Sequence, residues 1–439
     1  MIWFYRILYL PVLALILPSY LVRMWRRGGY SRGFFDRFGL IRVPERNSVK
    51  VKRIWLQAVS VGELLAIRPI LEYFAADPTI EVVLTTTTST GLKIALQKYP
   101  GLATTIGVFP LDFWLFSRSA WSHIQPDAVL LTESELWPEH LHQARTRKVP
   151  VILINARLSD RSYKIHKTVP FLSKILFRQI DKLLASSQHD YNRFLDIGVE
   201  SQKIRLFGNI KCDIHVEPLL SKNKIRNLMT EFGFQAENEE TRTPSIILGA
   251  STWPGEEEAL LSTLKTALKN GINCRLVIVP RHPERRKEIQ TVLEGNELSF
   301  HFRSDTKIAQ PNTMIYVGDT IGELRFFTQA SDIVFVGRSL PPHREGQTPI
   351  EAAAYGKPIL TGKGMSSFHD ISRSLIACGG ALEVESALNL EEKILRLLQS
   401  ETERREMAEA ALQWHSCNQG ATMKTIDEVM NWMHCIDVK

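Results

Sequence analysis

The sequence predicts an α/β protein with two domains, each built on a parallel sheet. Short apolar runs typical of strands alternate with longer segments whose apolar residues recur at helical spacing. This alternation occurs twice, and a polar stretch, residues 215–244, separates the two series. Continuous apolar strands with helical crossovers are typical of parallel sheets covered on both faces. The chain of 439 residues is also too long for one hydrophobic core.

The first series predicts a Rossmann-like domain that extends from residue 28 to residue 215. Its expected strands are residues 53–59, 80–87, 127–133, 149–157 and 182–187. The segments between them have the apolar spacing of helices, over residues 62–76, 90–99, 138–147 and 188–198.

The second series predicts another domain of the same kind, from residue 216 to residue 439. Its expected strands are residues 245–251, 273–281, 314–319, 332–339 and 357–362, and its helices are residues 254–270, 283–295, 321–330 and 348–356. The last helical segment, about 401–433, is long enough to return to the first domain. Two such domains are expected to face each other across a cleft. Ligands of open α/β sheets bind outside the carboxyl ends of the strands, so we expect the site at that edge.

Residues 1–27 differ in kind from the rest of the chain. The run from residue 7 to residue 22 is almost wholly apolar. A basic cluster follows it, made of Arg23, Arg26, Arg27 and Arg32. A cleavable signal peptide would carry its charges before the apolar run. We therefore expect an uncleaved membrane anchor with the body of the protein on the cytoplasmic side, the alternative being a buried first helix of the domain that follows.

Composition narrows the class of partner. With 44% hydrophobic and 23% charged residues, the bulk of the chain is typical of a globular protein. The net charge of +7 agrees with an anionic surface or substrate, but no basic, aromatic-interleaved patch or motif indicates nucleic acid. The five cysteines lack CxxC spacing, which indicates a reducing compartment and no metal site. Neither GxxxxGK[ST] nor a clean GxGxxG occurs, which disfavours ATP hydrolysis and dinucleotide redox chemistry.

The stretch "QAVSVGELLA", residues 57–66, places a carboxylate where the first strand gives way to a helix. Glu63 lies in the first turn of that helix, where the helix dipole stabilises the anionic form. Gly62 lets the backbone approach a ligand closely. A first-turn acid also stabilises its own helix, so this position alone leaves a structural role open.

Other polar residues follow the ends of later strands in the first domain. In "TESELWPEH", Glu133 and Glu135 come directly after a strand, and they point the same way only if the chain is still extended there. "NARLSDRS" contributes Arg157 after the next strand, and "GNIKCD" contributes Lys211. Each cation alone could be a solvated surface residue, but all of them are expected at one edge of the sheet.

The second domain has features of a nucleotide-binding half. In "GASTWPGEEEALL", Ser251 or Thr252 can cap a helix whose free N–H groups could face a phosphate. Arg281 in "VPRHPERR" lies at a strand end and suits a phosphate or a base carbonyl. Glu351, at the start of the helix in "GQTPIEAAAYGKP", is placed to accept hydrogen bonds from ribose hydroxyls.

Taken together, these segments resemble the Kdo transferase family. Its members move 3-deoxy-D-manno-octulosonic acid (Kdo) from CMP-Kdo onto a lipid A precursor in lipopolysaccharide biosynthesis. The resemblance covers nearly the whole chain and rests on ten motifs in the family's order. They are "RFG", "AVSVGE", "TTTTSTG", "TESELWP", "NARLSDRS", "GNIKCD", "GAST", "VPRHPER", "GDTIGEL" and "TPIEAAAYGKPIL".

The resemblance implies a GT-B architecture and an inverting reaction that needs no metal and no other cofactor. It implies that Glu63 is the general base, and that Glu135 and Lys211 stabilise the transition state. It maps the CMP site to Pro280, Arg281, Ile321, Gly322, Glu323, Thr348, Pro349, Ile350 and Glu351. It also implies that the partners are CMP-Kdo, the lipid A precursor lipid IVA and, through the N-terminus, the cytoplasmic face of the inner membrane.

The chain departs from the family pattern at two places. Gln57 stands where the family usually has His, and in "REGQTP" Gln347 and Thr348 take the places of His and Asn. Two alternatives to Kdo transfer stay open. One is another GT-B enzyme, such as a different nucleotide-sugar transferase or a UDP-sugar epimerase; the other is a membrane-bound nucleotide-binding protein without activity.

Overall fold

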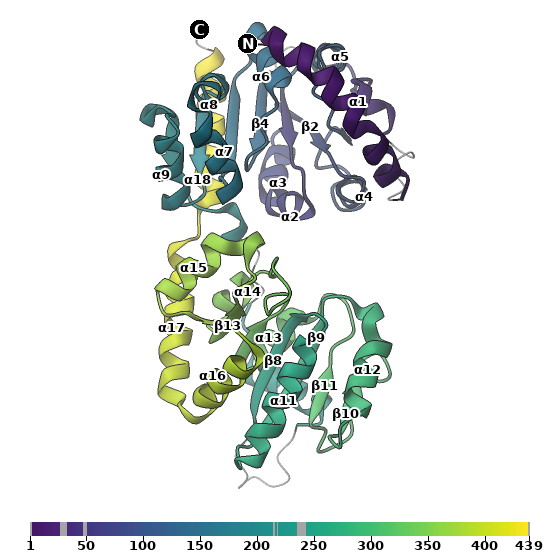
Figure 1. Ribbon diagram of the computed structural model, residues 1–439, viewed down its shortest axis with the longest axis vertical. Coiled ribbons are helices and arrows are strands. Elements are labelled where there is room, and N and C mark those ends of the chain that lie inside the picture. Colours follow the sequence, from purple (N-terminus) through teal and green to yellow (C-terminus); the bar gives the residue numbers. More distant parts are fainter. Residues whose placement is uncertain are drawn as a thin grey trace. The chain divides into compact units, whose positions relative to one another are not determined.

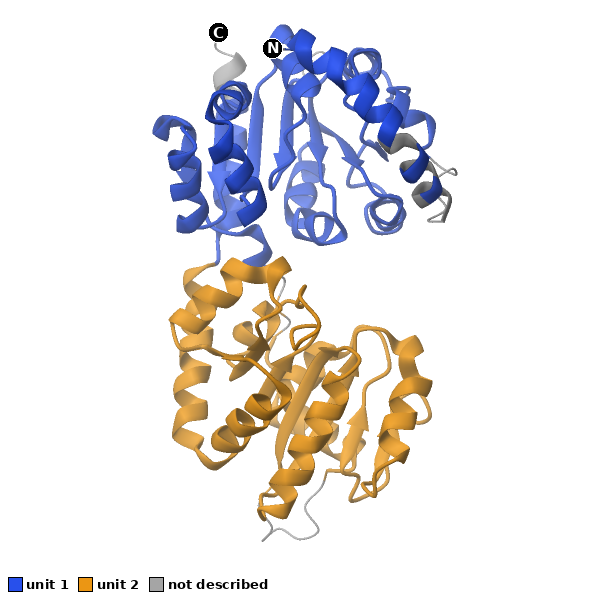
Figure 2. Ribbon diagram, in the orientation of Figure 1, with its two compact units in different colours: residues 1–213, 419–439 blue, residues 214–418 orange. Residues whose placement is uncertain are grey.

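The computed structural model divides the chain into two compact units (Figures 1 and 2). Unit 1 consists of Met1–Asp213 and Gln419–Lys439, and unit 2 is Ile214–Asn418. The structure describes residues 2–26, 33–46, 51–213, 216, 218–234 and 243–437, without the side chains of 16, 17, 20, 21, 23–26 and 434–437. The side chains of the N-terminal basic cluster thus lie outside the described part.

Unit 1 contains a seven-stranded parallel sheet in the order β3-β2-β1-β4-β5-β6-β7. Its strands are β1 (Lys52–Gln57), β2 (Ile80–Thr86), β3 (Thr105–Val108), β4 (Ala128–Thr132), β5 (Val151–Ala156), β6 (Lys182–Ala185) and β7 (Ile204–Leu206). Residues that alternate along β1 enter different cores, because successive side chains of a strand point to opposite faces. Ile54 and Leu56 belong to one buried cluster and Trp55 to the other. Helices therefore cover both faces of this sheet (Figure 1).

The helices of unit 1 include the crossovers that connect its strands. They are α1 (Ile2–Arg26), η1 (Phe35–Phe38), α2 (Val61–Ala66), α3 (Arg68–Ala76), α4 (Ser89–Lys98), α5 (Trp114–Ile124), α6 (Pro138–Arg147), α7 (Asp160–Thr168), α8 (Pro170–Phe177), α9 (Gln188–Asp196), η2 (Ser201–Lys203), η3 (Ile210–Cys212) and α18 (Ala421–Asp437). The single helix expected over 62–76 is two helices, because Pro69 lies in the first turn of α3, where its missing N–H is tolerated.

Helix α18 completes unit 1 although it follows unit 2 in the sequence. The carboxylate of Asp213 accepts hydrogen bonds from the backbone N–H groups of Gly420 and Thr422, both at 2.6 Å. Ile426 and Val429 of α18 are buried in the cluster that contains Leu56. The expected segment 401–433 is therefore interrupted, and α17 (Glu401–Cys417) ends before α18 begins.

Unit 2 repeats the design, with the strand order β10-β11-β9-β8-β12-β13-β14. Its strands are β8 (Ser245–Thr252), β9 (Cys274–Pro280), β10 (Phe300–Phe302), β11 (Ile315–Val317), β12 (Ile333–Val336), β13 (Ile359–Gly362) and β14 (Ala381–Val384). Its helices are α10 (Lys222–Phe232), α11 (Glu256–Lys269), η4 (Pro283–Arg285), α12 (Arg286–Glu294), α13 (Leu324–Ala330), α14 (Ile350–Ala354), η5 (Ser366–Phe368), α15 (His369–Ala377), α16 (Ala387–Gln399) and α17.

Sequence patterns did not predict the four short edge strands, nor the helices α5, α7, α8, α15 and α16. β3, β7, β10 and β14 have four residues or fewer, too few for a clear alternation of apolar and polar side chains. Helix α10 lies within the polar stretch that was predicted to separate the two domains. The stretch is polar overall because only one side of this helix is apolar.

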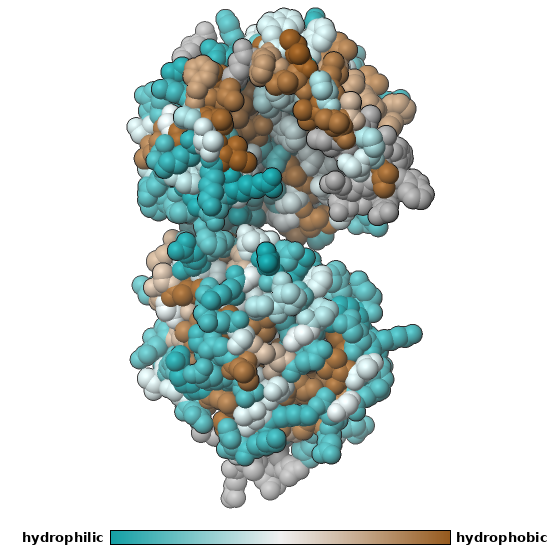
Figure 3. All heavy atoms as spheres, viewed as in Figure 1, coloured by the Kyte–Doolittle hydropathy of each residue, from teal (hydrophilic) through white to brown (hydrophobic). Residues whose placement is uncertain are grey.

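Helix α1 presents its apolar side chains to the outside of unit 1. Trp3, Ile7 and Leu15 are 69%, 69% and 81% exposed, and Figure 3 shows apolar residues gathered along this helix. Its polar residues make the contacts with the unit. Tyr5 donates to Asp112 at 2.6 Å, and Arg6 makes two hydrogen bonds of 2.8 Å with Glu139. A buried first helix, the alternative considered for this segment, would have the opposite arrangement.

The membrane anchor predicted for residues 1–27 is not supported as a spanning segment. Within the part of the chain that the structure describes, no helix combines the length and the apolar character needed to cross a bilayer.

In unit 2, the carboxylate of Glu256 joins two neighbouring loops. It accepts backbone hydrogen bonds from Trp253 after β8 and from Arg338, Ser339 and Leu340 after β12, at 2.7–3.0 Å. Glu256 is 1% exposed. If its carboxylate were removed, these N–H groups would therefore lose their acceptor at a place that water does not reach. A Cβ on Gly337 would approach Glu256 Oε2 to 2.7 Å, which explains the glycine at this close approach.

We expect Glu256→Ala to destabilise unit 2 by about 3 kcal/mol, because several buried N–H groups lose their acceptor. Native-state hydrogen exchange should show faster exchange at the amides of residues 338–340. Glu258→Ala is the matched control, since Glu258 accepts a single exposed bond from Gly255 and its loss should cost at most about 1 kcal/mol. Unchanged exchange at 338–340 in Glu256→Ala would contradict this account.

Candidate functional site

Strand order places the candidate residues of unit 1 at one edge of its sheet. β1 pairs with β2 on one side and with β4 on the other, so consecutive crossovers leave in opposite directions. The place where the direction reverses, outside the carboxyl ends of β1 and β4, is the usual ligand position in open α/β sheets. Glu63 follows β1, and Glu133 and Glu135 follow β4.

Glu63 is held by groups from both strands. Ser60 and Glu63 form a capping box, in which Ser60 Oγ accepts from the N–H of Glu63 and Glu63 Oε1 accepts from the N–H of Ser60. Glu63 Oε2 accepts from the N–H of Val59 at 2.9 Å and from the hydroxyl of Thr132 at 2.5 Å. The side chain is 8% exposed. Because Thr132 ends β4 and Val59 follows β1, this carboxylate links the ends of the two strands.

Glu135 is the second carboxyl group of this edge, in a different environment. Burial raises the pKa of Glu135 to about 7, and the negative charge of Glu63 adds to the increase. The indole N–H of Trp137 donates to Glu135 Oε2 at 3.0 Å and partly opposes the shift. The pair thus offers one carboxylate fixed by three donors and one carboxyl that titrates near neutral pH, the kind of difference that separates acid and base roles.

Lys211 belongs to a group of three charged residues at the same edge. Lys211 Nζ donates to Glu133 Oε1 at 2.5 Å, and Arg157 Nη1 lies 3.8 Å from Glu133 Oε2. The side chains of all three are between 15% and 19% exposed. Lys211 is positioned through η3, since the side chain of Asn155 accepts the N–H of Ile210.

The backbone is left-handed at the ends of both β4 and β5. Glu133 has φ +56° and Asn155 has φ +50°. Residues other than glycine adopt such φ values at a cost of about 1–3 kcal/mol, and residues with this strained backbone are common at functional sites. Because the chain turns at Glu133, the extended arrangement considered for Glu133 and Glu135 does not occur. Glu133 contacts Lys211, whereas Glu135 contacts Trp137.

In unit 2 the predicted CMP residues follow β9, β11 and β12. Pro280 ends β9, and the next residue, Arg281, is exposed, with its N–H bonded to the carbonyl of Thr252 at 3.2 Å. Ile321 is 89% exposed, in the turn before α13, and Gly322 has φ +88°. Glu323, by contrast, is already engaged. Arg303 forms two hydrogen bonds with its carboxylate and lowers the pKa of Glu323.

The remaining predicted CMP residues form the start of α14. Thr348 Oγ1 accepts the N–H of Ile350 at 3.3 Å, a long bond, while Pro349 takes the N-cap position. Glu351 lies in the first turn, and its side chain has no hydrogen bond within the described residues. Burial raises the pKa of Glu351, and the charge of Arg325 opposes this increase.

The cap predicted at Ser251 or Thr252 is wrong. Both residues belong to β8, and Gly255 is the N-cap of α11. The reason is that Trp253 and Pro254 extend the chain by one more turn before the helix can begin. The residues after β8 do form a candidate surface that sequence patterns missed. The guanidinium of Arg338 lies 4.4 Å from the ring centre of Trp253, and the rings of His282 and His343 also contact Trp253.

Gln57, the departure at the end of β1, is fully buried. Neither its amide nitrogen nor its amide oxygen has a hydrogen-bond partner within the described residues. Thr132 is another residue of the candidate site that the sequence patterns missed, because a threonine at a strand end belongs to no motif. Its hydroxyl reaches Glu63 only because β4 pairs with β1.

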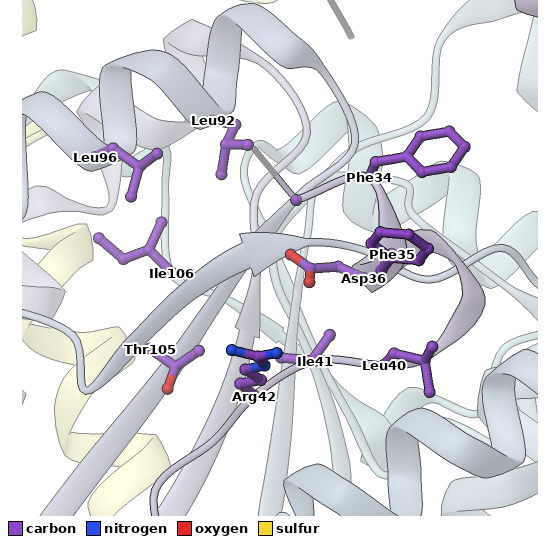
Figure 4. A pocket seen from close by; sticks show the side chains of 11 residues that line it. Phe34, Phe35, Asp36, Leu40, Ile41, Arg42, Leu92, Leu96, Thr105 and Ile106 are labelled. Carbon is purple, nitrogen blue, oxygen red and sulfur yellow. The ribbon is translucent and has the colours of Figure 1, made fainter. Parts of the chain in front are cut away.

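A cavity of about 720 Å³ lies beside the edge strand β3. Figure 4 shows Leu92 and Leu96 of α4 and Ile106 of β3 facing it from one side, and Phe34 and Asp36 from the other. Further lining residues are Gly33, Phe35, Leu40, Ile41, Arg42 and Thr105. The first turn of α4 adjoins the Glu63 loop, because Thr88 Oγ1 donates to the carbonyl of Val59. Leu92 and Leu96, which line the cavity, thus lie about one and two turns along α4 from the residue that contacts this loop.

Comparisons with known proteins cover both units. The family described as "3-Deoxy-D-manno-octulosonic-acid transferase (kdotransferase)" matches residues 32–214, and "Glycosyl transferases group 1" matches residues 250–414. A 3-deoxy-D-manno-octulosonic acid transferase of Haemophilus influenzae is 32% identical over 376 residues, which is 85% of this chain and 86% of the relative. The corresponding protein of Bordetella pertussis is 29% identical over 98% of this chain and 99% of the relative.

A solved structure supports the fold. The UDP-GlcNAc 2-epimerase of Neisseria meningitidis bound to UDP-GlcNAc covers 86% of this chain and all of its own, with a TM-score of 0.56 and 18% identity. At this identity the likeness shows the fold alone. It confirms the prediction of two parallel-sheet α/β domains of the GT-B kind, and it carries no information on the reaction.

The titration of Glu135 predicts how stability depends on pH. A folded-state pKa of about 7 against an ordinary value of 4.5 means that the folded protein binds this proton more tightly. Stability from this group is therefore present below pH 4.5 and lost as the pH rises through 7. We expect Glu135→Gln to lose less stability than the unmutated protein between pH 4.5 and 7, measured as melting temperature against pH.

Two comparisons keep this test specific. Burial also raises the pKa of Asp112 to about 7, and Asp112 contributes equally to the pH dependence of stability in both proteins. Glu72→Gln, at an exposed carboxylate paired with Arg68, shows what a change of glutamate to glutamine outside the candidate site does to the slope. Equal slopes for Glu135→Gln and the unmutated protein would show that Glu135 titrates at an ordinary pH.

Proposed function

We propose that the chain, which belongs to the 3-deoxy-D-manno-octulosonic acid (Kdo) transferase family, transfers Kdo from CMP-Kdo to a lipid A precursor such as lipid IVA. The reaction inverts the anomeric centre and serves lipopolysaccharide biosynthesis. One observation carries the proposal: Glu63 and Glu135 lie at the same sheet edge, where the hydroxyl of Thr132 donates to Glu63 and the charge of Glu63 adds to the raised pKa of Glu135.

The proposed reaction requires one group to accept a proton. An acceptor hydroxyl attacks the anomeric carbon of Kdo, the bond from that carbon to the phosphate oxygen breaks, and its electron pair leaves with CMP. The hydroxyl proton passes to the carboxylate of Glu63. The donors on Glu63 fix its orientation and occupy three of its acceptor positions, so that a fourth is left for the hydroxyl.

Two further residues act on the charges that develop. The sugar gains positive character as CMP departs, and the ionised form of Glu135 stabilises it. Lys211 stabilises the negative charge of the departing phosphate or of the sugar carboxylate. Both side chains lie at the same sheet edge as Glu63, which supports these assignments.

Unit 2 supplies the nucleotide site in this proposal. Pro280, Arg281, Ile321, Gly322 and Glu323, and then Thr348, Pro349, Ile350 and Glu351, bind CMP. Arg281 is exposed and suits the phosphate. Glu351, free of hydrogen bonds within the described residues, suits the ribose hydroxyls, whereas the carboxylate of Glu323 is already bonded to Arg303.

The acceptor is a lipid, and the protein is proposed to work at the cytoplasmic face of the inner membrane. Helix α1 rests its exposed apolar side chains on the lipid surface, as an interfacial helix does. The arginines at the end of this helix and just beyond it in the sequence, Arg23, Arg26, Arg27 and Arg32, favour anionic headgroups. The cavity beside α4 is of a size that takes small-molecule ligands and suits an apolar part of the acceptor.

Glu63→Gln tests the base directly. Glutamine keeps the capping box, so α2 should stay intact, while the proton acceptor is lost. We expect the rate of Kdo transfer from CMP-Kdo to lipid IVA to fall about 10²- to 10⁴-fold, measured by mass spectrometry of the lipid products. Glu72→Gln is the control at an exposed carboxylate of unit 1.

Two results would contradict the proposal. Full activity of Glu63→Gln would exclude Glu63 as the base. No transfer by the unmutated protein, together with thermal protection by UDP-GlcNAc but not by CMP, would favour a UDP-sugar enzyme, the alternative that shares the fold.

Membrane contact is tested by changing Trp3, Phe4 and Ile7 together to serine. All three are more than two-thirds exposed, and the anchoring bonds of Tyr5 and Arg6 remain, so the fold should be kept. We expect clearly weaker co-sedimentation with vesicles that contain phosphatidylglycerol. Leu388→Ser, which changes an exposed leucine of unit 2, should bind vesicles like the unmutated protein. Equal binding by the triple variant would exclude α1 as the contact.

A further inference from the structure

Arg157 carries a guanidinium group that the protein itself does not fully use. Its side chain is 19% exposed, and its one ion-pair contact in the described part of the chain is 3.8 Å long, beyond hydrogen-bond distance. Arg6 of the same unit, by contrast, makes two hydrogen bonds of 2.8 Å with Glu139. A part-buried guanidinium has five N–H donors to satisfy. Arg157 therefore has donors available for a ligand.

Glu133 fixes where this guanidinium lies. Its carboxylate is shared between Lys211 at 2.5 Å and Arg157 at 3.8 Å, so that two cations stand on either side of one anion. The backbone adds a second link, because the N–H of Arg157 donates to the carbonyl of Glu133 at 3.3 Å. Two positive charges and one negative charge leave the group with a net charge of +1.

The group stands next to the residues proposed for the reaction. Glu133 directly follows Thr132, whose hydroxyl contacts Glu63. β4 and β5 are neighbours in the sheet, and both end in a left-handed residue, Glu133 and Asn155. Strained backbone of this kind persists where the surrounding structure enforces it, and it gathers at ligand sites. Here the left-handed turn at Glu133 directs its carboxylate toward Lys211 and Arg157.

We propose that Arg157 is a substrate-binding residue that receives the carboxylate group of the sugar being transferred, and that Glu133 is the positioning residue that holds Arg157 and Lys211 for this contact. The inference rests on the proposed function, since that sugar is an acid. A planar guanidinium matches a carboxylate with two parallel hydrogen bonds, which a lysine cannot do. The proposal also assigns separate tasks to the two cations, with Lys211 left to the departing group.

The test compares Arg157→Gln and Arg157→Lys with the unmutated protein. We expect both to raise KM for CMP-Kdo, about ten- to a hundredfold for glutamine and less for lysine, while KM for the lipid acceptor changes less than twofold. Calorimetry separates the sugar from the nucleotide. Arg157→Gln should weaken the binding of CMP-Kdo and leave the binding of CMP unchanged.

Glu133→Gln tests the positioning role. It should raise the same KM, and the double variant with Arg157→Gln should be little worse than Arg157→Gln alone, because both changes act through one contact. Arg178→Gln is the matched control, an exposed arginine that precedes β6 and so lies at the opposite edge of the sheet. Melting temperatures of all variants show whether the fold is kept.

Several results would overturn the inference. A rise in KM for the lipid acceptor alone would assign Arg157 to an anionic group of the acceptor. Equal weakening of CMP and CMP-Kdo would assign it to the nucleotide phosphate, and unchanged constants would exclude it from binding. No Kdo transfer by the unmutated protein would instead refute the proposed function, and the difference between CMP and CMP-Kdo binding would still decide the role of Arg157.

Discussion

The pairing of β4 beside β1 is the constraint on which the candidate site depends. These strands are neighbours in the sheet although β2 and β3 lie between them in the sequence. The pairing brings Thr132 to the carboxylate of Glu63, at the sheet edge where Glu135 and Lys211 also lie. Any change that shifted this register by one residue would turn the side chains of β4 to the other face and remove Thr132 from Glu63. The fold and the chemistry therefore share one element.

Charge is distributed at this edge so that each ionised group has a defined partner. Backbone N–H groups and a hydroxyl hold Glu63, an indole holds Glu135, and Glu133 is shared between Lys211 and Arg157. Part-buried charges need such partners, because desolvation is costly. Arg157 is the exception, because its partner does not use all of its donors. Arg157 has donors to spare, and the strained backbone at Glu133 and Asn155 shows that the protein maintains this arrangement at a cost.

Helix α1 illustrates how the same sequence pattern serves different structures. Its apolar residues predicted a membrane anchor, and a buried helix would produce a similar pattern. The contacts of Tyr5 with Asp112 and of Arg6 with Glu139 decide which side of the helix faces the unit. With polar residues used for docking, apolar residues such as Ile7 are left outside. A hydropathy pattern does not contain this information, because it records which residues are apolar and not what they face.

The sequence by itself determined the two parallel-sheet units, most of their strands and the positions of Glu63 and Glu135 at strand ends, because buried strands and first-turn residues leave local patterns. It did not determine the edge strands, the start of α11 at Gly255, or the turn that separates Glu133 from Glu135. Only the tertiary structure decided that Thr132 reaches Glu63 and that Glu133 joins Lys211 to Arg157. Those contacts join residues far apart in the chain, and their distances follow from strand order and backbone geometry, which no local pattern encodes.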